Sequence, residues 1–283
     1  MKISVIITVY NRTAFLREAI ESALVQEPKP EVLVVDDGSD AENCELIEQI
    51  VVEFEDIKLI RNSENRGVSA ARNLGVRNTT GDFVLFLDDD DLLFEDYFKR
   101  IPEMSFASDL ILTMAELIGD PNSNRFQRLQ KFYNFNRDTF HMNTEHPLYF
   151  LAYVPPIHGV LFRKSLFERF QFSEAMTYGE DRLLLMDMQQ SGAKISTHDM
   201  ISCGYRIHEM KSVKESPFEY LKHTRESILL KNYTQRRFID FQFGYFAIRD
   251  KSYLAGLPYL VRSFFSIRVA SYLLKLTIAL IRK

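Results

Sequence analysis

The sequence predicts an α/β fold with a mostly parallel, Rossmann-like sheet covered by helices on both faces, followed by a helical C-terminal appendage. Over residues 1–91, apolar segments of strand length alternate with amphipathic segments of helix length. The strand segments are apolar throughout, which is typical of strands buried on both faces of a parallel sheet. Strands that alternate with helices also imply right-handed crossovers, which lay the strands side by side in one sheet.

The N-terminal half is expected to contain four strands and three helices. The strands are expected at residues 3–9, 32–35, 57–60 and 83–87. Thr13 is expected to cap the first helix, which Pro28 and Pro30 end. The second helix presents one apolar face, made of Leu46, Ile47, Ile50, Val51 and Phe54. Small residues predominate in the third helix, expected at residues 68–77.

The pattern is looser after the fourth strand. The elements expected there are strands at 108–117 and 200–208, a strand and short helix within 158–170, and a helix at 180–190. Residues 120–147 are polar and irregular. We therefore predict one domain over residues 1–212, divided into halves at 1–91 and 92–212, and a helical region at 213–283.

The charge of the chain is unevenly distributed. Residues 211–283 carry 14 Lys and Arg against 5 Asp and Glu, whereas residues 1–210 carry 21 against 34. A basic, apolar, helical tail suits peripheral contact with an anionic membrane, and packing on the first domain is the alternative. Its most apolar part, residues 269–281, is shorter than the ~20 residues that span a bilayer. No nucleic-acid partner is expected, because the basic residues lie beside aliphatic ones in the tail.

The cysteine content gives no indication of disulfide bonds or of a zinc site. The chain has only two cysteines, Cys44 and Cys203, without a CxxC pair, so neither a disulfide framework nor a zinc knuckle is indicated. The N-terminal apolar run is interrupted within ten residues, unlike a secretory signal. We expect a cytoplasmic location, which includes the inner face of the membrane.

Polar and acidic residues follow three of the predicted strands. Thr8 and Tyr10 end the first strand, residues 36–39 follow the second, and four aspartates, 88–91, follow the fourth. Ligands of open α/β sheets bind outside the carboxyl ends of the strands. This edge of the sheet is therefore the expected ligand site.

The four aspartates repel one another unless a positive charge lies among them. Carboxylates are preferred ligands of Mg²⁺ and Mn²⁺, which also bind substrate phosphates. The alternative is an acidic turn that caps a helix at Leu92. At the second strand, Asp37 can accept an N–H of a nucleotide base on which Tyr10 stacks, although a simple strand-to-helix turn is the alternative. A glycine-rich phosphate loop is absent after the first strand, which excludes the dinucleotide and P-loop motifs.

Four blocks of sequence together resemble family 2 glycosyltransferases of the GT-A fold. The blocks are SVIITVYNR, LVVDDGS, NRGVSAARNLGVRNTTGDFVLFLDDDD and GED, in that order over residues 3–208. The resemblance implies that Thr8, Tyr10 and Asp37 hold the nucleotide base. It implies that Arg72 lies near the nucleotide or its diphosphate.

The same resemblance assigns roles to the acidic residues. Asp88 would lie by the ribose, and Asp90 would bind a divalent Mn²⁺ or Mg²⁺ that bridges the diphosphate. Asp89 departs from the family pattern, which often has a small residue there. Asp181 would be the general base, because a sugar hydroxyl must lose its proton to attack at neutral pH. Glu180 would touch the acceptor or orient Asp181.

Two histidines match family positions, His208 after the last predicted strand and His158 before the strand that begins at Val160. His208 would approach the metal or diphosphate, with a purely structural histidine as the alternative. His158 would belong to the acceptor pocket, with an ordinary loop residue as the alternative. Both assignments come from the resemblance and not from the residues alone.

The resemblance implies an inverting, metal-dependent transfer of a sugar from a UDP- or dTDP-sugar to a hydroxyl of a saccharide or lipid-linked acceptor, in surface polysaccharide synthesis. One alternative is a non-catalytic module that binds nucleotide-sugars or glycans with the same fold. A sugar-nucleotide pyrophosphorylase is the other, although it would need a glycine-rich, arginine-bearing loop where this chain has residues 10–13.

Overall fold

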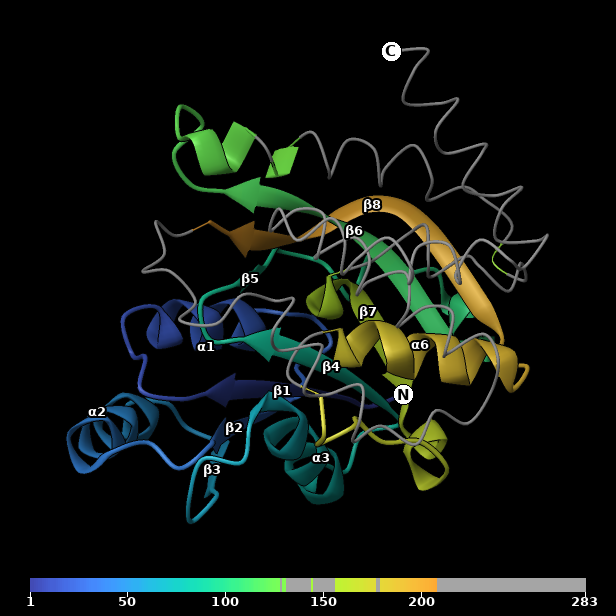
Figure 1. Cartoon of the computed structure of the whole chain (residues 1–283). Helices are drawn as coiled ribbons and strands as arrows, with labels where there is room; N and C mark the ends of the chain where they lie inside the picture. The colour runs from blue at the N-terminus through green and yellow to red at the C-terminus, as the bar shows by residue number, and fades with distance from the viewer. Residues whose placement is uncertain (128, 131–143, 145–155, 177–178, 208–283) are drawn as a thin grey trace, which may run out of the picture. The chain divides into compact units, whose positions relative to one another are not determined.

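A computed structural model describes residues 1–127, 129–130, 144, 156–176 and 179–207 (Figure 1). Eight strands of these residues form one sheet, in the order β3-β2-β1-β4-β7-β6-β8-β5. The strands are β1 (Ile3–Val9), β2 (Glu31–Asp36), β3 (Ile57–Arg61), β4 (Phe83–Asp88), β5 (Leu92–Leu93), β6 (Leu110–Ile118), β7 (Val160–Arg163) and β8 (Ile195–Arg206). The α-helices whose whole length lies within the described residues are α1 (Leu16–Leu24), α2 (Ala41–Val52), α3 (Val68–Asn78) and α6 (Glu180–Gln190).

The sheet has a parallel half and a mixed half. Strands β3, β2, β1 and β4 are parallel neighbours. Strand β7 pairs antiparallel with both β4 and β6, whereas β8 runs parallel to β6 and antiparallel to β5. The predicted mostly parallel sheet is confirmed, and its antiparallel pairs are confined to the mixed half.

Helices cover both faces of the parallel half, as predicted. Figure 1 shows α1 and α3 on opposite sides of β1. The odd-numbered side chains Ile3, Val5 and Ile7 pack with α1 and α2 in the main buried cluster. The even-numbered Ile6 faces α3, where a Cβ on Gly75 would lie 2.5 Å from its Cγ2 atom. A glycine is therefore needed for this close approach of helix and strand.

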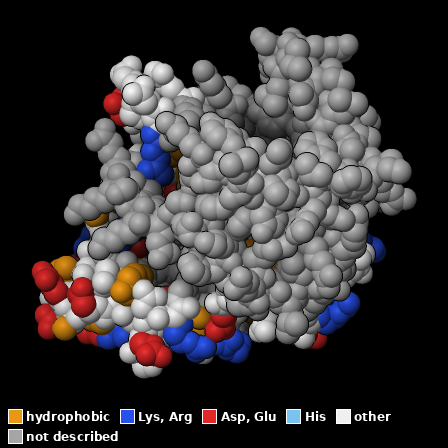
Figure 2. Space-filling model, viewed as in Figure 1, with side chains coloured by type: hydrophobic (Ala, Val, Ile, Leu, Met, Phe, Trp, Pro, Cys, Tyr) orange, Lys and Arg blue, Asp and Glu red, His pale blue; other side chains and the backbone are white. Residues whose placement is uncertain are grey.

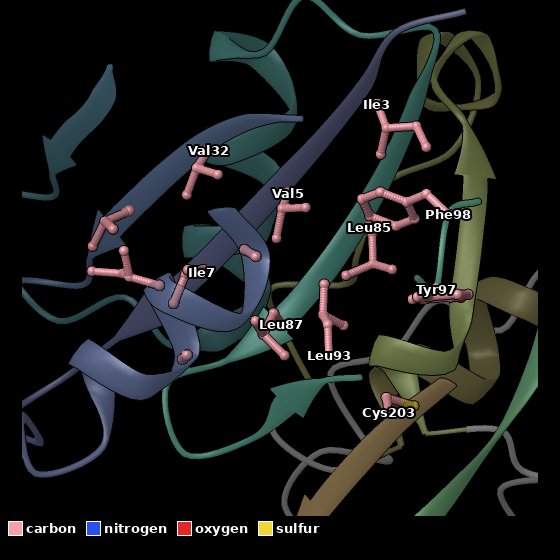
Figure 3. Packing of buried hydrophobic residues seen from close by; sticks show 14 of the residues in the cluster. Ile3, Val5, Ile7, Val32, Leu85, Leu87, Leu93, Tyr97, Phe98 and Cys203 are labelled. Carbon is pink, nitrogen blue, oxygen red and sulfur yellow. The ribbon is translucent and has the colours of Figure 1, made fainter. Parts of the chain in front are cut away.

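The main core lies where the two halves of the sheet meet. Figure 3 shows Leu85 and Leu87 of β4 beside Leu93, Tyr97 and Phe98, with Cys203 of β8 below them and Val5 and Val32 farther along the sheet. Tyr97 is fully buried, and its hydroxyl accepts a hydrogen bond from Thr113 Oγ1 at 3.1 Å. Burial of this apolar surface joins the parallel and mixed halves into one body.

Three local predictions were wrong. The Thr13 side chain does not cap α1, whose N-cap is Phe15; instead the Thr13 carbonyl accepts a hydrogen bond from Leu16 N at 3.2 Å. Leu46 is 39% exposed, so the buried face of α2 contains Ile47 and Val51 without it. Strand β8 begins at Ile195 and not at residue 200, because pairing with β6 extends to Leu110 across a register shift.

The chain divides into two compact units. The first contains residues 1–174 and 180–209, and the second contains residues 175–179 and 210–283. The helical region predicted at 213–283 lies outside the described residues, so the boundary at 212 stays a prediction. Within the described ranges, no helix is long and apolar enough to cross a membrane.

Acidic side chains gather over α2 in Figure 2, where Glu42, Glu45 and Glu48 are exposed.

Candidate active site

The strand register brings the predicted site residues to one edge of the sheet. Thr8 pairs with Asp88 of β4 on one side, and Val9 pairs with Asp36 of β2 on the other. The ends of β2, β1 and β4 therefore lie side by side, as expected for a ligand-binding edge. Thr8 is buried, whereas Tyr10 is 44% exposed beyond the end of β1.

Asp37 is held in a fixed position directly after β2. It is buried, and its Oδ1 atom accepts hydrogen bonds from Asn62 Nδ2 at 2.7 Å and from Arg66 N at 3.2 Å. The next residue, Gly38, has φ 74°, and a Cβ there would lie 2.3 Å from the Glu64 carbonyl carbon. Only glycine fits this turn, because both the backbone angle and the space exclude a side chain.

The acidic turn after β4 does not begin a helix. Leu92 lies in the short strand β5, so the helix-capping interpretation of the four aspartates was wrong. Instead, the turn carries an internal cation: Arg12 Nη1 lies 2.8 Å from Asp90 Oδ2, and Nη2 contacts Asp89 Oδ1. Arg12 was not predicted as a site residue, although its place just beyond the polar end of β1 was a usable signal.

Burial and crowding change the acidity of two aspartates in this turn. Burial, together with the charges of Asp90 and Asp88, raises the pKa of Asp89 to about 7 despite the opposing effect of Arg12. Burial and the charge of Asp88 raise the pKa of Asp91 to about 9. These two carboxylates are therefore protonated more readily than exposed ones, which reduces repulsion within the turn.

Arg72 joins the acidic turn to helix α6. Its Nη2 atom lies 2.9 Å from Asp88 Oδ1, and its Nη1 atom lies 2.8 Å from Glu180 Oε1. The guanidinium is buried and lies 5.4 Å from the ring centre of Phe172. The burial of Asp88 alone would raise its pKa, but the charges of Arg72 and His158 lower it. The structure thus brings Asp88, Arg72 and Glu180 together, as an ion-paired bridge that the sequence did not reveal.

The predicted base lies at the N-terminus of α6, beside this bridge. Asp181 is partly exposed, and its Oδ1 atom accepts a hydrogen bond from Arg182 N at 2.6 Å. Glu180 is buried, and both this burial and the charge of Asp181 raise its pKa against the effect of Arg72. The buried carboxylate is thus fixed by Arg72, while the neighbouring carboxylate faces a more open environment.

His158 is a buried residue rather than an ordinary loop residue. It lies in the 3-10 helix η2 (Ile157–Gly159), with its Nδ1 atom 3.2 Å from Asp91 Oδ2 and its ring stacked 6.0 Å from that of Tyr205. Asp91 Oδ1 also accepts a hydrogen bond from Arg206 N at 2.7 Å. These contacts tie the acidic turn to η2 and β8. The other predicted histidine, His208, lies outside the described residues.

Asp90 and Asp88 are the carboxylates of this turn that could share a divalent cation with the phosphates of a ligand. Among the described residues, no group of three or more His, Cys, Asp or Glu side chains is arranged to hold a metal. The carboxylate of Asp90 nevertheless binds a positively charged group of the chain, because it forms an ion pair with the guanidinium of Arg12. One or two carboxylates plus substrate phosphates are a common way for proteins to hold Mg²⁺. Asp90, with Asp88 beside it, fits that pattern.

Comparison with known protein families identifies the chain. A family model described as "Glycosyl transferase family 2" matches residues 4–170. The chain belongs to glycosyl transferase family 2. This confirms the resemblance on which the site assignments depend, since the matched residues contain the first three of its four sequence blocks.

Several curated relatives in the family share part of their length with this chain. An uncharacterized glycosyltransferase of Rickettsia felis is 46% identical over 34% of this chain and 16% of its own length. One of Haemophilus influenzae is 34% identical over 39% of this chain and 45% of its own length. YwdF of Bacillus subtilis is 29% identical over 62% of this chain and 63% of its own length. The matched segments thus span less than two thirds of these relatives.

Solved structures have the same fold. TarS of S. aureus in complex with UDP-GlcNAc has a TM-score of 0.56 and 22% identity, covering 89% of this chain and 73% of that one. A mannosyltransferase of Pyrobaculum calidifontis, in complex with GDP-Man and Mn²⁺, has a TM-score of 0.57 and 18% identity, covering 98% of this chain and 75% of that one. The family 2 domain described here therefore has the GT-A fold, as predicted.

Proposed function

We propose that this chain is an inverting, metal-dependent glycosyltransferase that moves a sugar from a nucleotide-sugar, with UDP- or dTDP-sugars favoured, to an acceptor hydroxyl. The observation that carries the proposal is the bridge from the acidic turn to the N-terminus of α6, through Arg72. The bridge supports an active site in which the donor-binding residues and the general base lie together. A binding module would not require a general base.

The base and ribose of the donor would lie across the ends of β1, β2 and β4. Asp37 would accept an N–H from the base, because its carboxylate is held in place by Asn62 and by the backbone of Arg66. Tyr10 is exposed enough to stack on the base, and Thr8 is buried near the end of β1. Asp88 would lie by the ribose at the end of β4.

Asp90 would hold the divalent cation, with Asp88 beside it. When bound, Mn²⁺ or Mg²⁺ supplies positive charge that stabilises the departing diphosphate. A role for His208 at the metal stays a prediction from the resemblance. Mn²⁺ in the GDP-Man complex of the P. calidifontis mannosyltransferase supports metal use in a neighbour of the same fold.

Asp181 would accept the proton of the incoming hydroxyl. It is partly exposed at the start of α6, whereas the neighbouring Glu180 is buried and ion-paired with Arg72. Glu180 would therefore orient Asp181 through the helix terminus rather than take the proton itself. A single displacement of this kind inverts the configuration at the anomeric carbon and needs no nucleophile from the protein.

The acceptor is proposed to be a saccharide or a lipid-linked saccharide in surface polysaccharide synthesis. This part of the proposal depends on the basic, apolar composition of residues 213–283, which suits the cytoplasmic face of a membrane. Sedimentation of the full chain with vesicles of neutral and of anionic lipid would test it. Equal binding to both would contradict membrane recruitment by charge.

The decisive experiment measures release of nucleoside diphosphate from UDP-, dTDP- and GDP-sugars with Mn²⁺, Mg²⁺ or EDTA. We expect one donor to turn over with metal and not with EDTA. Asp181→Asn should lower the rate by about 10²- to 10⁴-fold, because a positioned base contributes that much. Asp90→Ala should remove the metal dependence together with the activity.

The matched control is Asp187→Asn, the same substitution on the same helix, which should keep its rate within about twofold of wild type. Equal rates in Asp181→Asn and wild type would contradict the assignment of the base. Metal-dependent donor binding without turnover, measured by calorimetry with acceptor mixtures present, would favour the binding-module alternative. Absence of binding to every donor would overturn the proposed function.

A further inference from the structure

Arg12 places a positive charge of the chain itself at the proposed metal position. It follows Asn11, which has a left-handed φ of 49°, just beyond the end of β1. Its guanidinium reaches two successive carboxylates of the acidic turn, with Nη1 2.8 Å from Asp90 Oδ2 and Nη2 in contact with Asp89. Asp90, to which the proposed function assigns the metal, is therefore already paired with an internal cation.

The two ends of this contact differ in exposure. The Asp89 side chain is 3% exposed, and that of Asp90 is 13% exposed, whereas the Arg12 side chain is 49% exposed. A half-exposed arginine can change its partner without unpacking a core, since much of its length already lies in water. The buried Asp89 would keep the guanidinium nearby if it left Asp90.

We propose that Arg12 is a positioning residue that competes with the divalent cation for Asp90, and that Asp89 tethers it beside the site. This inference rests on the proposed function. In the absence of donor, the guanidinium neutralises Asp90 and weakens metal binding. A donor diphosphate, which a guanidinium binds through paired hydrogen bonds, gives Arg12 another anionic partner. Metal and donor are then expected to bind cooperatively, because each favours release of Asp90 by Arg12.

This inference also assigns a role to Asp89, the carboxylate that departs from the family pattern. The carboxylate of Asp89 gives the Arg12 guanidinium a second ion-pair partner, which a small residue could not supply. The alternative is that Arg12 and the two aspartates form a fixed ion pair that only stabilises the turn. The two possibilities predict different effects of Arg12 on metal binding.

The test is an electron paramagnetic resonance titration of the full chain with Mn²⁺, which reports free Mn²⁺ directly, with and without UDP. Without UDP, Arg12→Gln should bind Mn²⁺ about five- to tenfold more tightly than wild type, the size of a typical coupling between two ligands. Arg12→Lys should show a smaller increase, since one ammonium cannot span both carboxylates. With UDP present, the difference should fall to about twofold or less.

Arg206→Gln is the matched control, because it removes the guanidinium of β8 that contacts the acidic turn and also pairs with Glu18. The Nε atom of Arg206 donates to the main-chain oxygen of Asp90 at 2.8 Å, not to its carboxylate. General electrostatics would raise Mn²⁺ affinity equally in both variants, and UDP would not change the effect. Direct competition predicts the larger, UDP-sensitive increase in Arg12→Gln alone.

The outcomes separate this inference from the proposed function. If wild type binds no Mn²⁺ even with UDP, the proposed metal-dependent donor site fails. If wild type binds Mn²⁺ with UDP, but Arg12→Gln and Arg12→Lys bind it no more tightly than wild type or than Arg206→Gln, the competition is overturned and the proposed function stands. Circular dichroism of each variant checks folding, and Arg12→Lys decides the result should Arg12→Gln not fold.

Discussion

Two arginines, Arg12 and Arg72, form ion pairs with carboxylates of the acidic turn, and their surroundings differ. Arg72 is 5% exposed and joins Asp88 to Glu180 through two ion pairs, with Phe172 beside its guanidinium. Arg12 is 49% exposed and spans Asp89 and Asp90. A buried guanidinium between two carboxylates cannot leave without exposing unpaired charge, whereas a half-exposed one can. Arg72 therefore forms a fixed bridge between two carboxylates, whereas Arg12 forms an ion pair that can exchange partners.

The largest effect is expected from removal of the buried bridge. Arg72→Met leaves Asp88 and Glu180 without their shared cation, and we expect a loss of about 3–5 kcal/mol in the free energy of unfolding. Urea denaturation followed by circular dichroism measures it. The double variant with Glu180→Gln should recover part of the loss, because one of the stranded charges is gone. A loss below about 1 kcal/mol would contradict the fixed bridge.

A smaller effect is expected at Asp91, on the enclosed side of the turn. Its pKa is raised to about 9 by burial and by Asp88, whereas an aspartate in an unfolded chain titrates near ~4. The folded chain keeps a proton that the unfolded chain releases, so this group lowers wild-type stability as the pH rises from about 4 to about 9.

Asp91→Asn removes that titration while keeping an acceptor for Arg206 N. Relative to wild type, its free energy of unfolding should increase by about 2–3 kcal/mol between pH 5 and pH 7, because each pH unit in this window contributes about 1.4 kcal/mol. Urea denaturation at a series of pH values measures the difference. Parallel stability curves for the two proteins would show that Asp91 does not hold its proton in the folded state.

The smallest effect on stability is expected from Arg12→Gln. The exposed arginine loses little packing, and Asp89, whose pKa is already about 7, can become neutral at slight cost. We expect a change of about 1 kcal/mol or less at pH 6 by urea denaturation. Arg17→Gln is the control, since it breaks an ion pair with Glu53 in which both side chains are exposed. A loss as large as that of Arg72→Met would remove the distinction between the two arginines.

The fold was predictable from sequence where local pattern and burial agree. Strands β1, β2 and β4 are apolar along nearly their whole length, and helix α6 begins and ends where its pattern predicted. The start of β8 was missed because most of Ile195–Met200 is only partly buried and lacks an apolar run. Its strand character comes from pairing with β6, a contact between distant segments that local pattern does not contain.

The site was predictable as a set of chemical groups but not as a set of contacts. The positions of Asp37, Asp88 and Asp90 at strand ends follow from the sequence. Arg72 and Glu180 are separated by 108 residues, so their ion pair depends on how α3 and α6 approach the same edge. The partners of Arg12 depend likewise on the burial of Asp89, which only the folded structure determines.

The close approach of α3 to β1 has a consequence for how this domain can diverge. A side chain at position 75 has no room while Ile6 keeps its Cγ2 atom 2.5 Å from the place where a Cβ would be. A substitution at position 75 is therefore tolerable only after position 6 has become smaller. The two positions are expected to change as a pair during evolution. The smaller residue at position 6 must come first, because it makes room for a side chain at position 75.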